Sequence, residues 1–246
     1  PGSDPGAAIA SWAKSHGVRN LGADPGAIRH AIWERMLEAA PEMTLVPAKG
    51  WGVTLRAVKE PAEIERIAAA CAVADRALAA ILPKVVPGAT EAQLAWLLEW
   101  DAVERDEAPS LFVGGAHEED LGLYARVLDG QQAAIAALRR AVEGGATELP
   151  SGREVDRVAR VSMGDATGVY EHGLGHGIGL QTHESPSLSR GASERPLPSP
   201  TVFSVEPGFY LEDRIGIRIE DLVAVDLAGR RLSTLTRFPS SPLIVG

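Results

Sequence analysis

HGLGHGIGLQTHE, residues 172–184, is the most informative stretch of the sequence because it holds three of the chain's six histidines. Their spacing of four places His172 and His176 on one side of either a helix or a strand. The alternate glycines oppose a helix, since each costs about 1 kcal/mol in a helix interior. An extended, glycine-lined segment lets its backbone approach a ligand closely. The competing interpretation is a glycine-rich turn with incidental surface histidines.

Two predicted strands downstream end in carboxylates. Residues 201–208, TVFSVEPG, alternate so that Ser204 and Glu206 share one face, with Glu206 just before a predicted Pro-Gly turn. Residues 214–221, RIGIRIED, place isoleucines on one face and Arg218 and Glu220 on the other. A nearby guanidinium favours the ionised carboxylate and can orient it by a forked hydrogen bond. Taken alone, Glu206 is better interpreted as a solvated carboxylate at the end of a strand. For residues 214–221 the competing interpretation is a strand with a polar face in water, but the flanking hydrophobic runs and the position of Arg218 beside Glu220 weigh against it.

One histidine and two carboxylates on β elements could converge into a metal site. Nitrogen and oxygen ligands without thiolate suit Mn²⁺, Co²⁺, Fe²⁺ or Zn²⁺. Two ions held by bridging carboxylates would make hydroxide from water and polarise a carbonyl. Further histidines nearby could stabilise a developing oxyanion or shuttle protons to a leaving amine.

Composition excludes several classes of function. The chain has 246 residues and a net charge of −9, which argues against a general nucleic-acid binder. No apolar run approaches the ~20 residues of a membrane span, and the first residues show no secretion signal. The single Cys71 excludes an internal disulfide and a cysteine-built metal site. We therefore expect a cytoplasmic protein.

The order of predicted elements suggests two domains. Residues 1–55 predict two helices, opened by Asp4-Pro5 and Asp24-Pro25, and two strands. These four elements amount to part of an α/β domain. From residue 56, apolar spacing and capping signals predict helices at Pro61–Ile81, from Thr90, at Glu118 to about Val142, and from Ser151. After Gly164 the pattern is that of short strands.

Three segments together resemble a known family: His172–Glu184, Thr201–Tyr210 and Gly216–Asp221 are similar to those of the pita-bread metallopeptidases, which include prolidase, Xaa-Pro aminopeptidase and methionine aminopeptidase. Leu55–Ile64 resembles the linker of the proline-specific branch. The resemblance implies an α+β pita-bread (creatinase/aminopeptidase) catalytic domain at 56–246, preceded by a partial creatinase-like α/β domain at 1–55.

The resemblance also implies roles for individual residues. His176, Glu206 and Glu220 would be metal ligands of two divalent ions (Mn, Co or Zn), with Glu220 bridging them. Glu206 would also handle the proton of the attacking water, His172 and His183 would contact substrate and intermediate, and Arg218 would steady Glu220. The implied reaction is hydrolysis of the bond preceding proline in a dipeptide or peptide, by a homodimer without nucleic-acid or membrane partners.

The sequence departs from the family in one place. The family site has five ligands, and its remaining two are aspartates on a β-hairpin that should precede residue 113. Residues 107–119 contain neither those aspartates nor the substrate-binding histidine expected before them, and His117 is not a substitute for that histidine. Ala108–Ser110 resembles the beginning of that region and Val113–Gly115 its end, whereas the acidic run at 118–120 reads as the first turn of a helix.

Two explanations of this deficit remain open. Either the natural protein has a hairpin segment that this chain omits near 110–113, or the family member has lost it. We favour omission, because removing central strands would leave neighbouring backbone groups unpaired. In that case the metals would be absent or weakly bound. The competing function is a catalytically inactive pita-bread module that binds peptides or proteins; a creatinase-type hydrolase fits less well, because it replaces the metal ligands.

Overall fold

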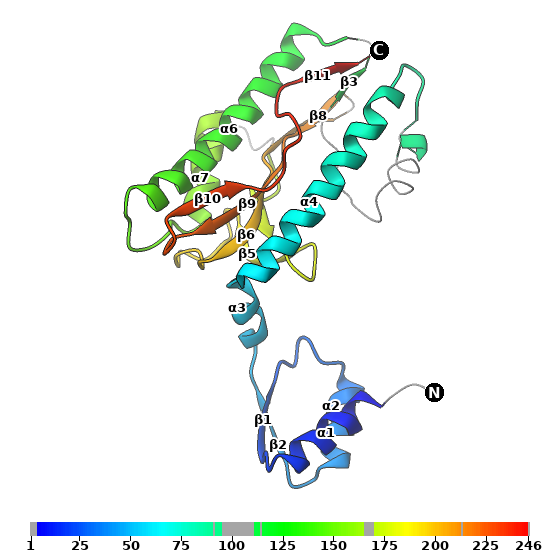
Figure 1. Cartoon of the computed structure of the whole chain (residues 1–246), viewed down its shortest axis with the longest axis vertical. Helices are drawn as coiled ribbons and strands as arrows, with labels where there is room; N and C mark the ends of the chain where they lie inside the picture. The colour runs from blue at the N-terminus through cyan, green and yellow to red at the C-terminus, as the bar shows by residue number, and fades with distance from the viewer. Residues whose placement is uncertain are drawn as a thin grey trace. The chain divides into compact units, whose positions relative to one another are not determined.

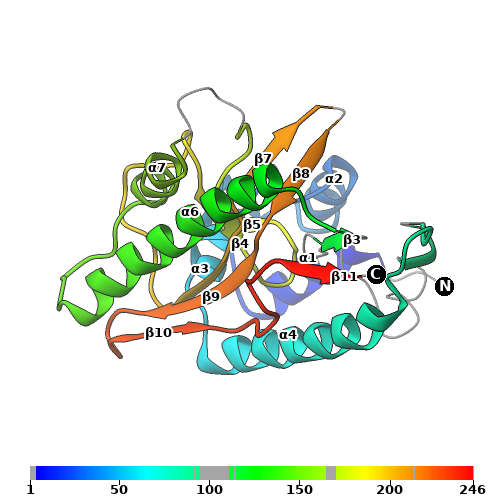
Figure 2. The ribbon, with the colours of Figure 1, turned by 90° about the horizontal axis from the view of Figure 1, so that it is seen from above.

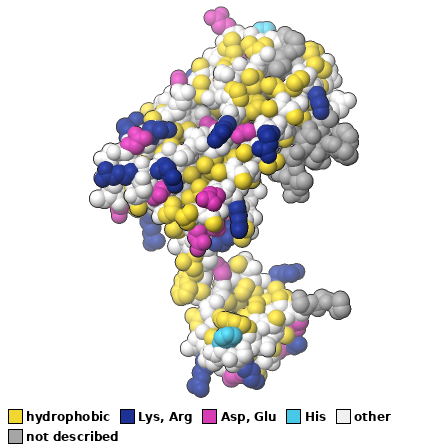
Figure 3. Space-filling model, in the orientation of Figure 1, with side chains coloured by type: hydrophobic (Ala, Val, Ile, Leu, Met, Phe, Trp, Pro, Cys, Tyr) yellow, Lys and Arg dark blue, Asp and Glu magenta, His cyan; other side chains and the backbone are white. Residues whose placement is uncertain are grey.

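The computed structural model describes residues 4–90, 92–94, 111–113, 115–164, 170–212 and 214–245. The chain divides into two units, Pro1–Arg56 and Ala57–Gly246. No helix in these described ranges is long and apolar enough to cross a membrane. On the face shown in Figure 3, Lys and Arg side chains lie interspersed with acidic and apolar ones.

The first unit pairs two parallel strands with two helices. Its elements in chain order are α1 (Pro5–Ser15), β1 (Asn20–Ala23), α2 (His30–Ala39), β2 (Thr44–Pro47) and most of α3 (Trp51–Ala57). The carboxylate of Asp4 caps α1 by accepting a hydrogen bond from the Ala7 amide at 3.0 Å. The small core between α1 and α2 contains Ala10, Ala13, Met36, Ala40 and Met43.

One predicted helix start in this unit is wrong. Asp24-Pro25 does not open a helix, because the Asp24 carboxylate accepts hydrogen bonds from the amides of Gly26 and Gly50, at 2.9 and 2.7 Å. These bonds close a turn and tie it to the residues after β2, so α2 begins only at His30. Local side-chain bonding to the backbone has competed with the helix here.

The second unit begins with helices close to their predicted bounds. They are α4 (Pro61–Ile81), a 3₁₀ turn at Leu82–Lys84, α6 (Glu118–Glu143) and α7 (Gly152–Met163). Ser151 and Glu154 form the predicted capping box of α7, and Gly164 ends that helix in the left-handed region, at φ +66°. Thr90 and Gln93 form their capping box as well, but the helix predicted beyond residue 94 lies outside the described residues.

The described residues of the second unit also form three sheets (Figures 1 and 2). The five-stranded sheet has the order β10-β9-β6-β4-β5, from β4 (Gly175–Gly177), β5 (Glu184–Leu188), β6 (Thr201–Val205), β9 (Asp221–Asp226) and β10 (Arg231–Thr234). Two antiparallel strands, β7 (Gly208–Leu211) and β8 (Ile215–Arg218), form a ribbon. Parallel β3 (Leu111–Val113) and β11 (Leu243–Val245) form a third pair.

Helices cover these sheets and enclose two apolar cores. Helix α6 lies along one face with α7 packed against it, and α4 runs along the opposite side (Figure 2). The larger core joins α6 and α7 to the five-stranded sheet and includes Ala134, Leu138, Val155, Phe203, Val205, Val223 and Val225. The smaller one lies under the ribbon and includes Tyr124, Val127, Met163, Tyr170, Phe209, Ile217 and Ile219.

The predicted Pro-Gly turn after Glu206 is also wrong. The chain passes straight from β6 into β7, and the two strands belong to different sheets. It returns in the same way from β8 into β9. The two crossings lie side by side, because the Ile219 amide donates a 3.3 Å hydrogen bond to the Pro207 carbonyl.

Candidate functional site

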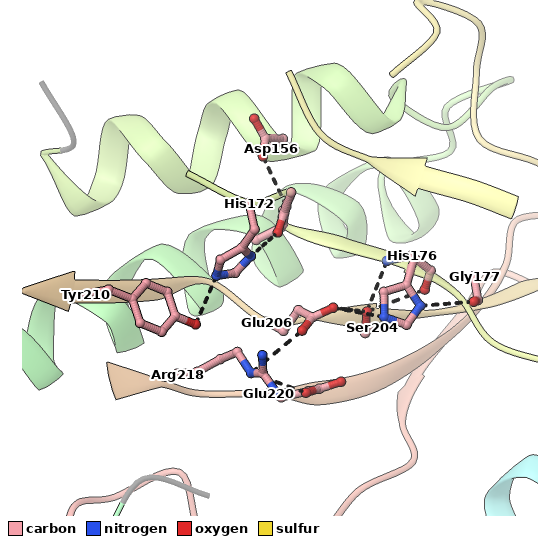
Figure 4. Close-up of polar contacts among 11 residues, drawn as sticks. Asp156, His172, His176, Gly177, Ser204, Glu206, Tyr210, Arg218 and Glu220 are labelled. Atoms are coloured by element: carbon pink, nitrogen blue, oxygen red, sulfur yellow. Dashed lines mark hydrogen bonds and ion pairs between the residues drawn. The ribbon is translucent and has the colours of Figure 1, made fainter. Parts of the chain in front are cut away.

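Glu206 and Glu220 occupy the two side-by-side strand breaks. On the side of the five-stranded sheet, Val205 pairs with Asp221, and on the side of the ribbon, Gly208 pairs with Arg218. Both pairs follow one antiparallel register, which places Glu206 directly opposite Glu220. Directly opposed residues have their Cβ atoms about 5 Å apart, and like charges at such positions repel. The fold therefore holds two mostly buried carboxylates face to face (Figure 4).

His176 joins this pair from the neighbouring strand β4. Its Nε2 lies 3.1 Å from Oε1 of Glu206, and its Nδ1 lies 3.2 Å from the Gly177 carbonyl. The carbonyl and the ionised carboxylate both only accept, so each contact is a hydrogen bond only when the facing ring nitrogen of His176 carries a proton. Ser204 ties strand and site together: its Oγ accepts from the His176 amide at 3.0 Å and donates to Oε1 of Glu206 at 2.9 Å.

Charge at the site is balanced by Arg218. Its Nε lies 3.8 Å from Oε2 of Glu206 and 3.9 Å from Oε2 of Glu220, so the guanidinium lies between the two carboxylates (Figure 4). Burial alone raises the pKa of Glu206, but hydrogen bonds from His176 and Ser204, together with the charge of Arg218, bring that pKa below its ordinary value. Glu206 is therefore ionised at neutral pH.

His172 lies beside this cluster and bonds to Tyr210. Its Nε2 is 3.0 Å from the Tyr210 hydroxyl, and its Nδ1 is 2.7 Å from the Gly173 carbonyl. Its ring also meets the edge of Tyr170, with ring centroids 4.8 Å apart. Burial lowers the pKa of His172, outweighing the effects of the Gly173 carbonyl and Glu206, so the imidazole is neutral at pH 7.

His183 is exposed and lies against the other face of the site. Its ring centroid is 4.1 Å from that of His176. The next residue, Glu184, pairs with the fully buried ammonium of Lys59, which precedes α4. The Lys59 amide also donates a 2.8 Å hydrogen bond to the Pro200 carbonyl. The segment before α4 thus anchors the first residue of β5, which directly follows His183.

The structure gathers all six predicted residues in one region, and it adds two that the sequence analysis did not assign to the site. His176, Glu206, Arg218 and Glu220 form the central cluster, with His172 and His183 beside it. Tyr210 was missed because it lies in an apolar run, although it is only four residues beyond Glu206. Ser204 was placed on the face of Glu206 by strand alternation, but nothing in the sequence indicated its bond to the His176 amide.

The donor atoms define what the site can do chemically. One imidazole nitrogen and two carboxylates are ligands of the kind that Mn²⁺, Co²⁺ and Zn²⁺ accept. Among the residues that the structure describes, no three His, Cys, Asp or Glu side chains already converge as closely as ligands of one ion do. His176 touches Glu206, whereas Glu220 is linked to them through Arg218.

Known protein sequences are similar to the part of the chain that carries the site. The profile of metallopeptidase family M24 matches residues 106–226, a range that includes every candidate site residue. The chain is 26% identical to the Xaa-Pro dipeptidase of Pyrococcus furiosus, in a match that covers 74% of this chain and 64% of that protein. The chain therefore spans less than two thirds of that relative.

A second relative, the uncharacterized peptidase YqhT of Bacillus subtilis, is 25% identical over 284 aligned positions, covering 96% of this chain and 78% of that protein. Because 284 positions exceed the 246 residues of the chain by 38, at least that many positions of the relative have no residue here.

Solved structures show the fold. The X-Pro aminopeptidase from Thermotoga maritima superposes with a TM-score of 0.83 at 24% identity, covering 99% of this chain and 80% of that one. The likeness confirms the predicted α+β pita-bread architecture.

Proposed function

Because the chain belongs to metallopeptidase family M24, we propose that it is a metal-dependent peptidase that hydrolyses the bond preceding proline. Its substrate would be an Xaa-Pro dipeptide or a longer Xaa-Pro peptide. We propose two divalent ions (Mn, Co or Zn), a homodimer and a cytoplasmic setting for the complete enzyme. The observation that supports this proposal most is the opposition of Glu206 and Glu220 beside His176.

The residues present fit a divalent cation in their chemistry. Two carboxylates held opposite each other repel, and a cation between them relieves that repulsion. The ring of His176 is oriented as in metal-ligating histidines, with Nδ1 facing a backbone carbonyl and Nε2 directed at a carboxylate. Three donors are fewer than the five that the family resemblance implies. The alignment positions without a residue in this chain leave room for the two aspartates.

Each residue would contribute one action to the reaction. A divalent ion, when bound, supplies a Lewis acid that polarises a carbonyl and lowers the pKa of water. Glu206, kept ionised by its hydrogen bonds, would accept the proton of the attacking water. His172 would hydrogen-bond the substrate, and exposed His183 would stabilise the tetrahedral intermediate. Arg218 would orient Glu220.

A panel of peptides tests the proposal. With added Mn²⁺ we expect protein from the complete gene to hydrolyse Ala-Pro or Ala-Pro-Ala, and to hydrolyse Ala-Ala far more slowly. Glu206→Gln should abolish cleavage, whereas Glu212→Gln, which alters an exposed carboxylate on the ribbon, should not. Equal cleavage by the wild type and Glu206→Gln would contradict the assignment. Peptide binding without any cleavage would favour a non-catalytic binding module, which the relatives above do not support.

A further inference from the structure

Helix α7 buries an ion pair next to the site. The Asp156 carboxylate accepts two hydrogen bonds from Arg160, from Nε at 2.7 Å and from Nη2 at 3.1 Å. Asp156 is 1% exposed and Arg160 is 7% exposed. Burying two charges costs several kcal/mol per ion unless further hydrogen bonds satisfy them. The neighbours of this pair therefore show what it holds.

Those neighbours are backbone groups of the segment that leads to His176. Arg160 donates from Nη1 to the Tyr170 carbonyl and from Nη2 to the His172 carbonyl, each at 2.6 Å. The Leu174 amide donates to Oδ1 of Asp156 at 3.1 Å. On its other side, the Leu174 carbonyl accepts from the Glu206 amide at 2.7 Å. The ion pair thus supplies the hydrogen-bond partners that a neighbouring strand would otherwise provide to this segment.

The Asp156–Arg160 ion pair acts as a clamp on the peptide groups on both sides of Gly173. It holds the carbonyl before this residue and the amide after it. A Cβ at position 173 would lie 2.9 Å from the Leu188 carbonyl oxygen, so the backbone also has little room to move outward. The carbonyl of Gly173 is consequently fixed where it meets Nδ1 of His172, at 2.7 Å.

This contact determines which nitrogen of His172 carries the proton. A carbonyl only accepts, so Nδ1 must donate. In the neutral ring Nε2 is then an acceptor, and it accepts a hydrogen bond from the Tyr210 hydroxyl at 3.0 Å. The guanidinium of Arg160 also stacks on the Tyr170 ring, 3.9 Å from its centroid, and that ring touches His172. Arg160 thus constrains both the backbone and the ring neighbour of His172.

We propose that Asp156 and Arg160 are positioning residues that hold His172 in its Nδ1–H tautomer through the Gly173 peptide. The catalytic consequence rests on the proposed function, in which His172 contacts the substrate. The tautomer itself does not depend on that function. Arg160→Lys keeps the buried charge but removes the fork that reaches two carbonyls at once.

Nitrogen NMR of ¹⁵N-histidine-labelled protein measures the tautomer directly. In the wild type we expect a protonated Nδ1 and an unprotonated Nε2 at His172, and in Arg160→Lys we expect this preference to be lost. Arg153→Lys is the matched control, because Arg153 on the same helix bonds the Ala192 carbonyl and Glu194, away from the site. Asp156→Asn provides a second test if Arg160→Lys does not fold.

Two results would overturn the inference: an Nε2–H tautomer in the wild type, or an unchanged tautomer in folded Arg160→Lys or Asp156→Asn. For Ala-Pro hydrolysis, Arg160→Lys should lower kcat about 10- to 100-fold with little change in KM, as a misplaced catalytic group does. An unchanged kcat with a lost tautomer would refute the catalytic part. Absence of peptidase activity in the wild type would refute the proposed function while leaving the NMR result valid.

Discussion

Glu206 lies directly opposite Glu220 in one antiparallel register that continues across two adjacent strand breaks. Regular strands on both sides fix this opposition, so the two carboxylates cannot separate without shifting β6 against β9. Arg218 lies between them, nearly 4 Å from each. Because opposed like charges are destabilising, the arrangement has a folding cost that a bound cation would remove.

Glu220→Gln tests this cost. The substitution removes one charge of the opposed pair and one contact of the partly exposed Arg218. We expect the free energy of unfolding without metal to change by less than about 1 kcal/mol. Added Mn²⁺ should raise the melting temperature of the wild type and have little effect on the variant. Equal stabilisation of both proteins by Mn²⁺ would show that Glu220 is not a ligand; Glu212→Gln serves as the control.

Lys59→Met tests the anchor beneath His183. Lys59 is fully buried and pairs with Glu184, so removing the ammonium leaves a mostly buried carboxylate without that partner. Breaking one side of such a pair should lower the free energy of unfolding by about 3–5 kcal/mol. Urea titration measures the change. Arg139→Met, in the exposed pair with Glu143, should cost less than about 0.5 kcal/mol, and similar losses in the two variants would argue against the anchor.

Gly175→Ala tests the close approach of β4 to β6. A Cβ at position 175 would lie 1.9 Å from the Ser204 carbonyl oxygen, so the strands must separate. We expect a loss of about 1–3 kcal/mol in stability and weaker Mn²⁺ binding, because His176 moves with β4. Gly122→Ala, where a Cβ meets open space on α6, should instead stabilise by about 0.5–1 kcal/mol. Wild-type stability in Gly175→Ala would contradict this account.

Glu154 at the start of α7 predicts a pH dependence. Hydrogen bonds from the Ser151 amide and hydroxyl hold the pKa of Glu154 below its ordinary value. A carboxyl whose pKa falls on folding stabilises above its unfolded pKa, and this stabilisation is lost as pH decreases. Glu154→Gln should therefore cost up to about 1 kcal/mol at pH 7 and progressively less below about pH 4.5. A difference that grows in acid would contradict the sign.

The sequence predicted elements well where local signals agree. Helix α7 starts at the predicted Ser151–Glu154 capping box and ends at Gly164, the residue after which the sequence pattern changes to that of short strands. The same kind of signal failed at Asp24, because its carboxylate found a more distant partner in the Gly50 amide. Propensity describes the local competition only, and tertiary contacts decide it.

The site could be predicted in its residue types but not in its geometry. Opposition of Glu206 and Glu220 depends on two sheets sharing one register, which no local pattern encodes. Asp156 and Arg160, four apart on a helix, resemble an ordinary surface pair until their burial is known. The boundaries of the two domains and the segment predicted to be missing near 110–113 remain predictions.

The rate of Ala-Pro and Ala-Pro-Ala hydrolysis as a function of Mn²⁺ concentration tests the central claim most directly. Protein from the complete gene, stripped with a chelator, should be inactive and should gain activity that saturates with added Mn²⁺. Glu220→Gln should gain none at the same concentrations. Hydrolysis that is independent of Mn²⁺, or no hydrolysis of either peptide at saturating Mn²⁺, would contradict the assignment of this chain as a proline-specific metallopeptidase.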